Sequence, residues 1–480
     1  MDFDDEARIL VEELSRYEKE SATGTKPVVK LTPMNQLVED LGLRVHLDRG
    51  GLTGDEYRRF VRNYLEATAR LYHPASLAHQ VAVPHHAGAL ASFLGAFTNN
   101  PMAIYEMGPA ATAIEYFIVN WLLEKVGWLP APYDKDEVSP MGHGAGVLTH
   151  GGSLANLTAL VAARTRLVPN VWEEGSPNDL AILAPADSHY SIARAVGILG
   201  IGAKSIFPLE VGAQGTVMPE RIEATLDRLT SQGKRPLAIV ANACSTSIGR
   251  FDPLREIGKI CQSRGIWFHV DGAHGAAALL SPRYRKLLDG VELADSITWD
   301  AHKLLRTPGL CTAILVRDAR TLDGAFHQDA SYLFHDKEQP GIDLVHRTIE
   351  CTKTALGLKL FAVLAALGEQ GLAGYIERQF AITRSAYDLL AGLPDFECAV
   401  PPQSNILCFR VHGSDELQLA IRDRLIAQGS FHLSTANFGG KRFLRMVVSN
   451  PQTGLVHINQ LVMQIRSICT MLPEELGRAS

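Results

Sequence analysis

Features that mark several classes of protein are missing from this 480-residue sequence. Lysine and arginine are scattered and the formal net charge is -6, so no basic surface for nucleic acid is indicated. The seven cysteines never form a C-x-x-C pair, which argues against a zinc knuckle or a disulfide framework and for a reducing compartment. We therefore expect a small-molecule substrate, no metal site and no nucleic-acid partner.

Targeting signals and several catalytic motifs are missing too. The segment Met1–Glu6 is acidic where a signal peptide would be basic, and the apolar stretch at 355–367 is too short to span a membrane. We expect a cytoplasmic protein without a membrane partner. The sequence has no G-x-G-x-x-G opening a β-α unit, no G-x-x-x-x-G-K-[ST] and no G-x-S-x-G. Dehydrogenases, nucleotide hydrolases and serine hydrolases are therefore disfavoured.

The hydrophobic pattern predicts an α/β fold. Hydrophobic residues make up 46% of the chain, and from about residue 148 to 318 short apolar runs alternate with longer amphipathic stretches. This alternation is typical of β-α units that build a parallel sheet. Strands are expected at 181–184, 205–209, 237–241, 266–270, 296–299 and 312–316. Helices are expected over most of 1–90 and at 112–126, 154–164, 219–229, 254–263 and 456–471.

The pattern also predicts three parts of the chain. A helical amino-terminal segment (1–90) precedes a large domain (91–370), and a smaller domain (371–480) follows. Composition changes after Gly371 and Gly374, and the turn at 393–395 leads into the last part.

Two runs carry the strongest chemical signal, FHVDGAHG at 268–275 and SITWDAHK at 296–303. Each is strand-like and then polar, so Asp271 and Lys303 should lie at the carboxyl ends of strands, where open α/β sheets bind ligands. An aspartate beside a pyridine nitrogen keeps that nitrogen protonated, and a lysine amine can form an imine with an aldehyde. Together these two residues predict an electron-sink cofactor bound at Lys303.

Further residues fit the same site. His189 follows the strand at 181–184 and is placed to stack on a planar ring, while Thr246 follows the strand at 237–241. The turn holding Gly152 and Ser153 opens a helix, and the free NH groups of a helix amino terminus bind phosphate. Each residue alone has an ordinary role available to it, such as a helix cap or a surface position. The joint order along the chain is what favours a functional site.

These motifs resemble the group II pyridoxal-phosphate decarboxylases, which act on glutamate, cysteine sulfinate, diaminobutyrate and aromatic amino acids. The resemblance extends to further segments, at His73-Pro74, Asn99-Asn100, 106–112, Glu115 and 443–451. It implies fold type I, an α/β fold of the pyridoxal-phosphate-dependent transferase type. Such a fold has a mainly parallel seven-stranded sheet and a smaller carboxy-terminal α+β domain.

The resemblance also implies a role for each site residue. The cofactor would be pyridoxal 5'-phosphate in the large domain, and the protein a homodimer with its active site at the interface. Lys303 is expected to be the catalytic Schiff-base lysine, with His189 as a second catalytic residue, and Arg445 would bind the substrate carboxylate. The other implied cofactor contacts are Asp271 at the pyridine nitrogen, Ala273 beneath the ring, His189 above it, Thr246 at a ring oxygen or the imine, and Gly152, Ser153 and His302 at the phosphate.

The substrate side is less defined by the sequence. Gln80 and the His85-His86 pair suit either substrate contact or plain surface positions, and non-aromatic substrates, acidic or diamino, are favoured. The family usually supplies a loop tyrosine as proton donor, yet no tyrosine lies between Phe334 and Lys353. His335, His346 and Tyr332 are the nearby candidates. The departure leaves open a lyase or an aldehyde synthase, and a cofactor-free binding protein is a further alternative.

Overall fold

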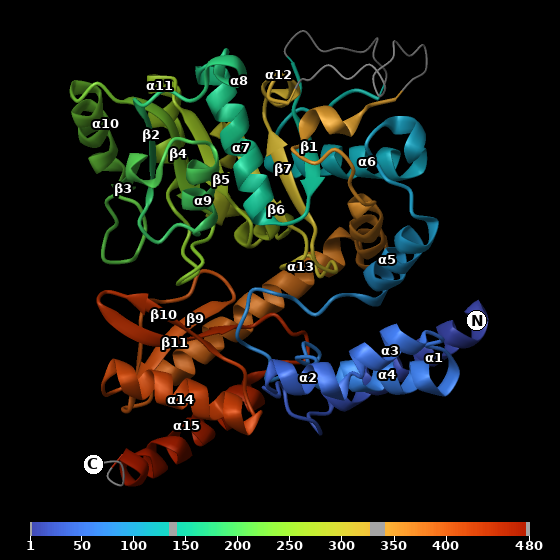
Figure 1. Ribbon diagram of the computed structural model, residues 1–480. Coiled ribbons are helices and arrows are strands. Elements are labelled where there is room, and N and C mark those ends of the chain that lie inside the picture. The colour runs from blue at the N-terminus through green and yellow to red at the C-terminus, as the bar shows by residue number, and fades with distance from the viewer. Residues whose placement is uncertain (1, 134–141, 327–340, 477–480) are drawn as a thin grey trace. The chain divides into compact units, whose positions relative to one another are not determined.

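The computed structural model describes residues 2–133, 142–326 and 341–476, and their contacts divide the chain into two units (Figure 1). The larger unit is Gln80–Arg378, and the smaller unit combines Met1–His79 with Gln379–Ser480. The contacts thus group the amino-terminal residues with the carboxy-terminal ones. The three-part division at residues 90 and 370 stays a prediction.

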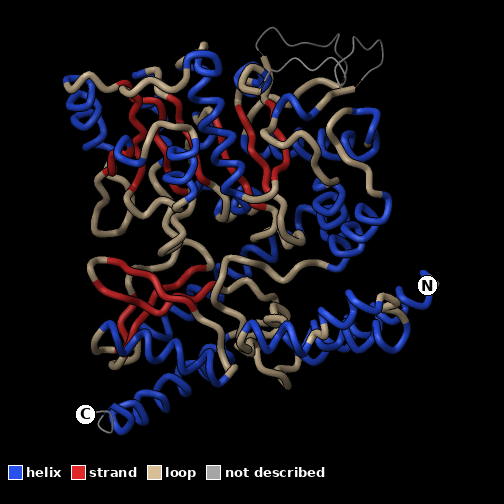
Figure 2. Tube along the Cα trace, viewed as in Figure 1, coloured by secondary structure: helices blue, strands red, loops and turns tan. Residues whose placement is uncertain are grey.

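The larger unit is built on a seven-stranded sheet with the order β1-β7-β6-β5-β4-β2-β3. Its strands, red in Figure 2, are β1 (Ala145–Thr149), β2 (Leu180–Pro185), β3 (Ile206–Leu209), β4 (Arg235–Asn242), β5 (Trp267–Asp271), β6 (Ser296–Asp300) and β7 (Thr312–Val316). Among these, β7 alone runs opposite to the others. The predicted α/β fold with a mainly parallel sheet is confirmed.

The central strands form where continuous apolar runs were predicted, because a strand covered on both faces needs no polar alternation. Strands β1, β2, β5, β6 and β7 are buried along their whole length. Strand β1 was not predicted. Its residue Gly146 lies against β7, where an added Cβ would be 2.6 Å from the Ile314 carbonyl oxygen. Because β7 approaches so closely, β1 has a glycine at this position, and the strand therefore lacks the run of bulky apolar residues from which the other strands were predicted.

Helices connect the strands of the larger unit. They are α5 (His86–Thr98), α6 (Pro109–Val126), α7 (Gly152–Leu167), α8 (Val171–Glu174), α9 (Ser191–Ile198), α10 (Ile222–Ser231), α11 (Leu254–Arg264) and α12 (Ala319–Asp323). Short 3-10 turns lie at Tyr105–Met107, Ala203–Ser205, Pro219–Arg221, Gly275–Leu280, Arg285–Leu288, Val291–Leu293 and Leu344–Arg347. Helix α7 packs against β5, β6 and β7 and is buried along most of its length.

The smaller unit contains an antiparallel sheet with the order β10-β11-β9-β8. Its strands are β8 (Phe396–Cys398), β9 (Ile406–Val411), β10 (Ser434–Phe438) and β11 (Lys441–Val447), and its helices include α14 (Asp415–Gln428) and α15 (Leu455–Leu476). Apolar residues from the sheet and from both helices form one core with Ala75 and Leu77. The carboxy-terminal part therefore has the predicted α+β character.

The amino-terminal residues of this unit form α1 (Phe3–Ala22), α2 (Met34–Asp40), α3 (Leu43–Arg49) and α4 (Gly54–Ala67). The expectation that helix continues to about residue 90 is wrong between Ala67 and His86. Within that stretch the backbone NH of Arg70 donates to the Val28 carbonyl oxygen and that of Leu77 to the His432 carbonyl oxygen, and turns rather than helix connect these contacts. Pro74 and Pro84, which disfavour helix interiors, also lie in it.

A buried carboxylate joins α1 to α4. Glu13 accepts hydrogen bonds from Arg62 at 2.7 Å, from Arg16 at 3.0 Å and from Arg58 at 3.2 Å. The bond from Arg62, together with those from Arg16 and Arg58, outweighs burial and lowers the pKa of Glu13 from 4.5 to about 2. Glu13 therefore stabilises the folded state most above pH 4.5, and the stabilisation is lost as the pH falls towards 2.

We predict that Glu13→Gln lowers the free energy of unfolding by about 1–2 kcal/mol at pH 7, since the charged hydrogen bonds are lost and the arginines stay partly hydrated. The difference from the parent protein should shrink as the pH falls below 4.5. Urea unfolding at several pH values measures this. Glu12→Gln is the matched control, because Glu12 is half exposed and bonds Arg58 alone among the described side chains. An equal effect at both positions would contradict the assignment.

Helix α13 (Leu356–Ala391) is, among the described residues, the one helix long and apolar enough to cross a membrane by length and composition. The apolar stretch at 355–367 was expected to be too short to span a membrane, but the helix continues to Ala391. The helix is interrupted at Gly368, whose φ of 67° and ψ of 168° are not helical, and a third of its apolar window is buried. Core helices of soluble proteins pass the same test of length and composition, so one such helix is weak evidence for a membrane span.

Candidate active site

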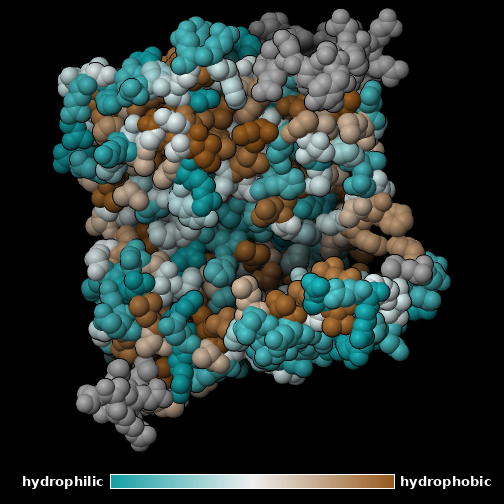
Figure 3. All heavy atoms as spheres, viewed as in Figure 1, coloured by the Kyte–Doolittle hydropathy of each residue, from teal (hydrophilic) through white to brown (hydrophobic). Residues whose placement is uncertain are grey.

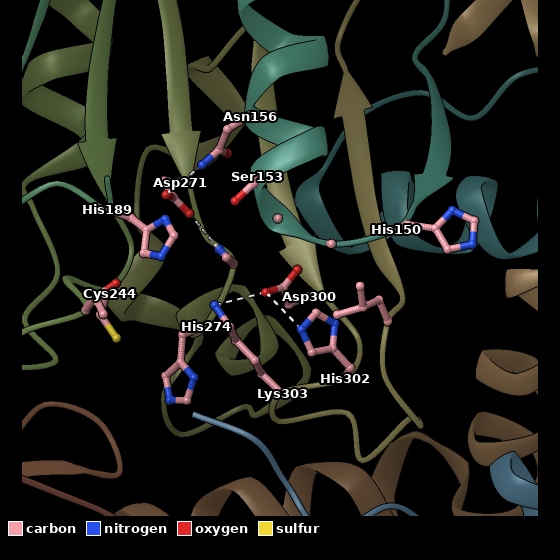
Figure 4. Close-up of a pocket in the computed structure, with 15 residues that line it drawn as sticks. His150, Ser153, Asn156, His189, Cys244, Asp271, His274, Asp300, His302 and Lys303 are labelled. Atoms are coloured by element: carbon pink, nitrogen blue, oxygen red, sulfur yellow. Dashed lines mark hydrogen bonds and ion pairs between the residues drawn. The ribbon is translucent and has the colours of Figure 1, made fainter. Parts of the chain in front are cut away.

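A cavity of about 260 Å³ opens at the carboxyl ends of the parallel strands of the larger unit (Figure 4). It is lined by His150, Gly151, Gly152, Ser153, Asn156, His189, Cys244, Thr246, Asp271, Ala273, His274, Asp300, His302, Lys303 and Leu310. All eight residues predicted to bind the cofactor are in this set. The structure thus brings them together, as expected for loops that follow neighbouring parallel strands.

Lys303 lies in a ring of charged groups. Its Nζ is 2.9 Å from a carboxylate oxygen of Asp300, and Asp271 also faces the cavity. Burial by itself would lower the pKa of Lys303, but the carboxylates of Asp300 and then Asp271 outweigh it and raise that pKa. These carboxylates therefore favour the ammonium form of Lys303.

Asp271 ends β5 and is fixed by two donors. The Asn156 side chain donates to one carboxylate oxygen at 3.0 Å, and the backbone NH of Ala273 donates to the other at 3.2 Å. Hydrogen bonds to both oxygens favour the ionised form of a carboxylate. Asp271 is thus suited to face a cation or a protonated ring nitrogen.

Side chains on one face of β5 and β6 form a chain of hydrogen bonds that leads to Asn156, a donor to Asp271. His269 and Ser296 are paired in register, and Trp267 donates to the Ser296 oxygen at 2.8 Å. The His269 Nδ1 lies 2.8 Å from the Ser296 oxygen, and its Nε2 lies 3.1 Å from the amide oxygen of Asn156. Burial lowers the pKa of His269 to about 4, so the ring is neutral and donates from Nε2. The chain orients Asn156 with its NH₂ group towards Asp271.

His189 opens the turn before α9. Its Nδ1 accepts a hydrogen bond from the Ser191 backbone NH at 3.3 Å and lies 2.8 Å from the Ser191 hydroxyl. Burial lowers the pKa of His189 and favours the neutral ring. Since Asn156 also donates to the Ser191 hydroxyl at 2.9 Å, one amide connects the predicted stacking residue with Asp271.

The glycine turn begins α7 at the edge of the cavity. Gly151 has a φ of 109°, a left-handed conformation that glycine adopts without strain, and it is the N-cap of the helix. The first NH groups of any helix lack an intrahelical acceptor, so this terminus can bind an anion. An added Cβ at Gly152 would lie 3.3 Å from the Asp300 carboxylate, and His302 lines the same side of the cavity.

Ion pairs hold the glycine turn and the residues just before it. Glu115 of α6 and Lys353 form an ion pair in which both side chains are 0% exposed, and Glu115 also accepts the backbone NH of Leu148 at 2.9 Å. His150 of the turn bonds Glu350 through Nδ1 and lies 3.1 Å from the Thr354 hydroxyl through Nε2. The segment at 350–354 is thereby connected to the glycine turn.

Several residues predicted on the substrate side do not line the cavity among the described residues. Gln80 and His346 are outside its lining, and His85 accepts the backbone NH of Ala87 as the N-cap of α5. Arg445 is on β11 in the smaller unit, where it donates to the Ala78 carbonyl oxygen at 3.2 Å. Two of the proposed proton donors, Tyr332 and His335, lie outside the described residues.

Sequence reasoning assigned no role to Asn156 and Asp300, which the structure places at the centre of the site. Asn156 follows Gly152 by one helical turn, so it faces the sheet from the same side as the glycine turn. Asp300 was visible in the motif that ends at Lys303, yet its contact with Nζ depends on the turn that follows β6. Helical spacing from the glycine turn was the one available signal.

The residues fit pyridoxal 5'-phosphate. The cavity offers a lysine amine for an aldehyde, a fixed carboxylate for a ring nitrogen and a helix amino terminus for a phosphate. Residues 63–412 match the family described as the pyridoxal-dependent decarboxylase conserved domain. The chain belongs to this family, as its motifs suggested, and is a pyridoxal-phosphate-dependent amino acid decarboxylase.

Relatives and solved structures agree with this assignment. Cysteine sulfinic acid decarboxylase of Mus musculus is 31% identical over 374 residues, which cover 74% of this chain and 73% of that protein. The acidic amino acid decarboxylase of Mus musculus is 28% identical over 462 residues (92% and 81%), and L-2,4-diaminobutyrate decarboxylase of Acinetobacter baumannii is 28% identical over 433 residues (85% and 82%). The crystal structure of mouse CSAD superposes with a TM-score of 0.86 at 25% identity, covering 96% of this chain and 98% of that one.

The crystal structure of Oryza sativa TDC with PLP and tryptamine has a TM-score of 0.88 at 24% identity and covers 98% of this chain and 99% of that one. At this identity the likeness concerns the fold alone. It supports the expected fold type I.

Proposed function

We propose that this enzyme decarboxylates a non-aromatic L-amino acid, acidic or diamino, to the corresponding amine and carbon dioxide. The observation that carries the proposal is that Lys303 and Asp271 meet in one cavity with a helix amino terminus. The named substrates of the relatives above, which are acidic amino acids, cysteine sulfinate and diaminobutyrate, support the substrate class.

In this proposal Lys303 binds the cofactor aldehyde covalently. Asp271 would face the ring nitrogen, His189 would stack on one face of the ring, and Ala273 would lie beneath the other. The NH groups at Gly152 and Ser153, together with His302, would hold the phosphate, and Thr246 would contact a ring oxygen or the imine. Bound pyridoxal phosphate supplies an electron sink for the bond that breaks at the α-carbon.

The protein residues contribute position and charge. Because both oxygens of Asp271 accept hydrogen bonds, the carboxylate is held in one orientation, in which it would favour a positive charge on the ring nitrogen. The neutral His189 ring can stack without placing a second cation above the cofactor. Arg445 and Gln80 are proposed to bind the substrate, with the arginine at a carboxylate.

The return of a proton to the α-carbon decides between two outcomes. The interval from Phe334 to Lys353 contains no tyrosine, so we propose a histidine donor, His335 or His346, or else Tyr332. The same observation favours a second candidate function, a decarboxylation-coupled aldehyde synthase or another lyase. The decarboxylase would release carbon dioxide and the amine. The aldehyde synthase would consume dioxygen as its oxidant and water, and would release an aldehyde, ammonia and hydrogen peroxide with the carbon dioxide.

We further propose a cytoplasmic homodimer. Helix α5 exposes Leu90, Phe93, Leu94 and Phe97, whose exposed fractions lie between 46% and 66%. Apolar atoms are visible at the surface in Figure 3 on the side where Figure 1 places α5. Contiguous apolar surface of this kind is typical of subunit interfaces. Sedimentation equilibrium should give twice the chain mass.

A substrate panel tests the proposed reaction. The holoenzyme is incubated with glutamate, aspartate, cysteine sulfinate, 2,4-diaminobutyrate, tyrosine and tryptophan, and carbon dioxide, amine, aldehyde and ammonia are measured. We expect an amine and carbon dioxide in equal amounts from one acidic or diamino substrate. Ammonia with an aldehyde would overturn decarboxylation to the amine, and turnover of an aromatic substrate alone would overturn the substrate class.

A further inference from the structure

Asp300 occupies a position that the proposed roles leave unexplained. It ends β6 directly opposite Thr312 of β7, and its carboxylate accepts a hydrogen bond from the Thr312 hydroxyl. The same carboxylate is 2.9 Å from Lys303 Nζ and 3.7 Å from His302 Nε2, and the side chain is 2% exposed. A fully buried anion is therefore in direct contact with the amine that must react.

Asp300 supplies the negative charge in direct contact with the Lys303 ammonium group. Asp271 and the thiol of Cys244 are the other groups that favour its charged form, while the His189 ring also faces it. Burial by itself would raise the pKa of Asp300, but Lys303 and then His302 outweigh it and lower that pKa, so both members of the pair are charged. Asp271 is already held by Asn156 and Ala273, which leaves Asp300 as the carboxylate with an ion pair to Nζ among the described residues.

An ammonium ion has no lone pair and cannot attack an aldehyde. Before the bond between Nζ and the aldehyde carbon forms, Nζ must release one proton to solvent, and the carbonyl oxygen then leaves as water. A buried carboxylate 2.9 Å from Nζ opposes the first of these events, because charged partners stabilise each other where water is scarce.

We propose that Asp300 is a positioning residue that holds Lys303 as an ammonium ion whenever the lysine is not joined to the cofactor, and so sets the pH at which the cofactor attaches. The proposal rests on the proposed role of Lys303. When a substrate amine displaces the lysine, the released amine takes up a proton and returns to Asp300. The ion pair thus favours release of Lys303 and slows its attachment.

The rate of attachment tests this directly. Full-length protein freed of cofactor is mixed with pyridoxal 5'-phosphate or with pyridoxal, which lacks the phosphate. The visible absorbance is followed from pH 6 to 9, and borohydride reduction with peptide mass analysis then counts labels on Lys303. At pH 7 we expect Asp300→Asn to attach both aldehydes about tenfold faster, as loss of one adjacent carboxylate increases the uncharged fraction of the amine. Its rate profile should also shift to lower pH.

Two further variants make the result decisive. Asp300→Ala also lacks the charge and should change the profile in the same direction, so a folding defect in one variant leaves the other informative. Asp187→Asn neutralises a half-buried carboxylate near the same edge of the sheet that bonds Ser247, and it should keep the parent profile. Unchanged profiles in both Asp300 variants would overturn the proposal.

The two aldehydes distinguish an effect of Asp300 on the lysine from an effect on the phosphate. Faster attachment of pyridoxal 5'-phosphate alone would show that Asp300 repels the phosphate rather than retains the lysine proton, which would also overturn the proposal. If the parent protein carries no label on Lys303 with either aldehyde, the proposed function itself fails. That outcome is distinct from labelled Lys303 with an unchanged pH profile.

Discussion

Asp271→Asn is expected to lower kcat by about 10²–10³-fold, the usual cost of removing one preorganised electrostatic group from an active site. The substitution keeps the shape of the side chain but removes the charge that would face the ring nitrogen. It also places an NH₂ group against one of the two donors, Asn156 or the Ala273 NH, that now point at the carboxylate. Steady-state kinetics with the substrate found in the panel measures the loss.

Asp187→Asn serves again as the matched control, because it neutralises a carboxylate outside the lining of the cavity. Its kcat should stay within about threefold of the parent, the range expected for a group without contact to reacting atoms. An Asp271→Asn enzyme with parental kcat and bound cofactor would contradict the role proposed for Asp271. Absorbance of the bound cofactor shows whether a loss reflects binding or chemistry.

Lys353→Met is expected to lower the free energy of unfolding by about 3–5 kcal/mol, the cost of leaving a buried charge without its partner. Lys353 and Glu115 are both fully buried, and α13 approaches the backbone of Glu115 so closely that a Cβ on Gly357 would lie 2.9 Å from its Cα. Neither side chain can reach water without separating these elements. Chemical unfolding of the holoenzyme measures the change.

A double variant distinguishes an ion pair from simple packing. Lys353→Met combined with Glu115→Gln removes both charges, and it should recover part of the stability that the single variant loses. Lys359→Met is a control in helix α13, since burial lowers the pKa of Lys359 below its usual value and a neutral residue there costs less. Additive losses in the double variant would contradict a buried ion pair.

The strands that carry the site could be predicted because each is a short apolar run bounded by polar residues. The six strands predicted between residues 181 and 316 are present with small shifts at their ends. Strand β3 begins at Ile206 because Ala203–Ser205 forms a 3-10 turn, and α10 begins at Ile222 after a similar turn at Pro219–Arg221. Strand β1 and the antiparallel direction of β7 could not be predicted, because direction depends on connections rather than on local sequence.

The cofactor contacts could be predicted from their order along the chain, whereas their supporting network could not. His269 looked like an ordinary strand residue, and its bond to Asn156 exists because α7 packs over β5 and β6. The same packing brings the Asn156 side chain to Asp271 as a donor. A single sequence carries no signal for tertiary contacts of this kind. The roles of Asp300 and Glu115 therefore became clear when the structure showed their partners, Lys303 and Lys353.

Borohydride reduction of the holoenzyme tests the central claim most directly, since it fixes the cofactor on the amine that carries it. Peptide mass analysis should find one pyridoxyl group per chain, on Lys303, and a Lys303→Ala protein should carry none and show no turnover. A label on Lys353 or Lys359, or an active Lys303→Ala enzyme, would contradict the account.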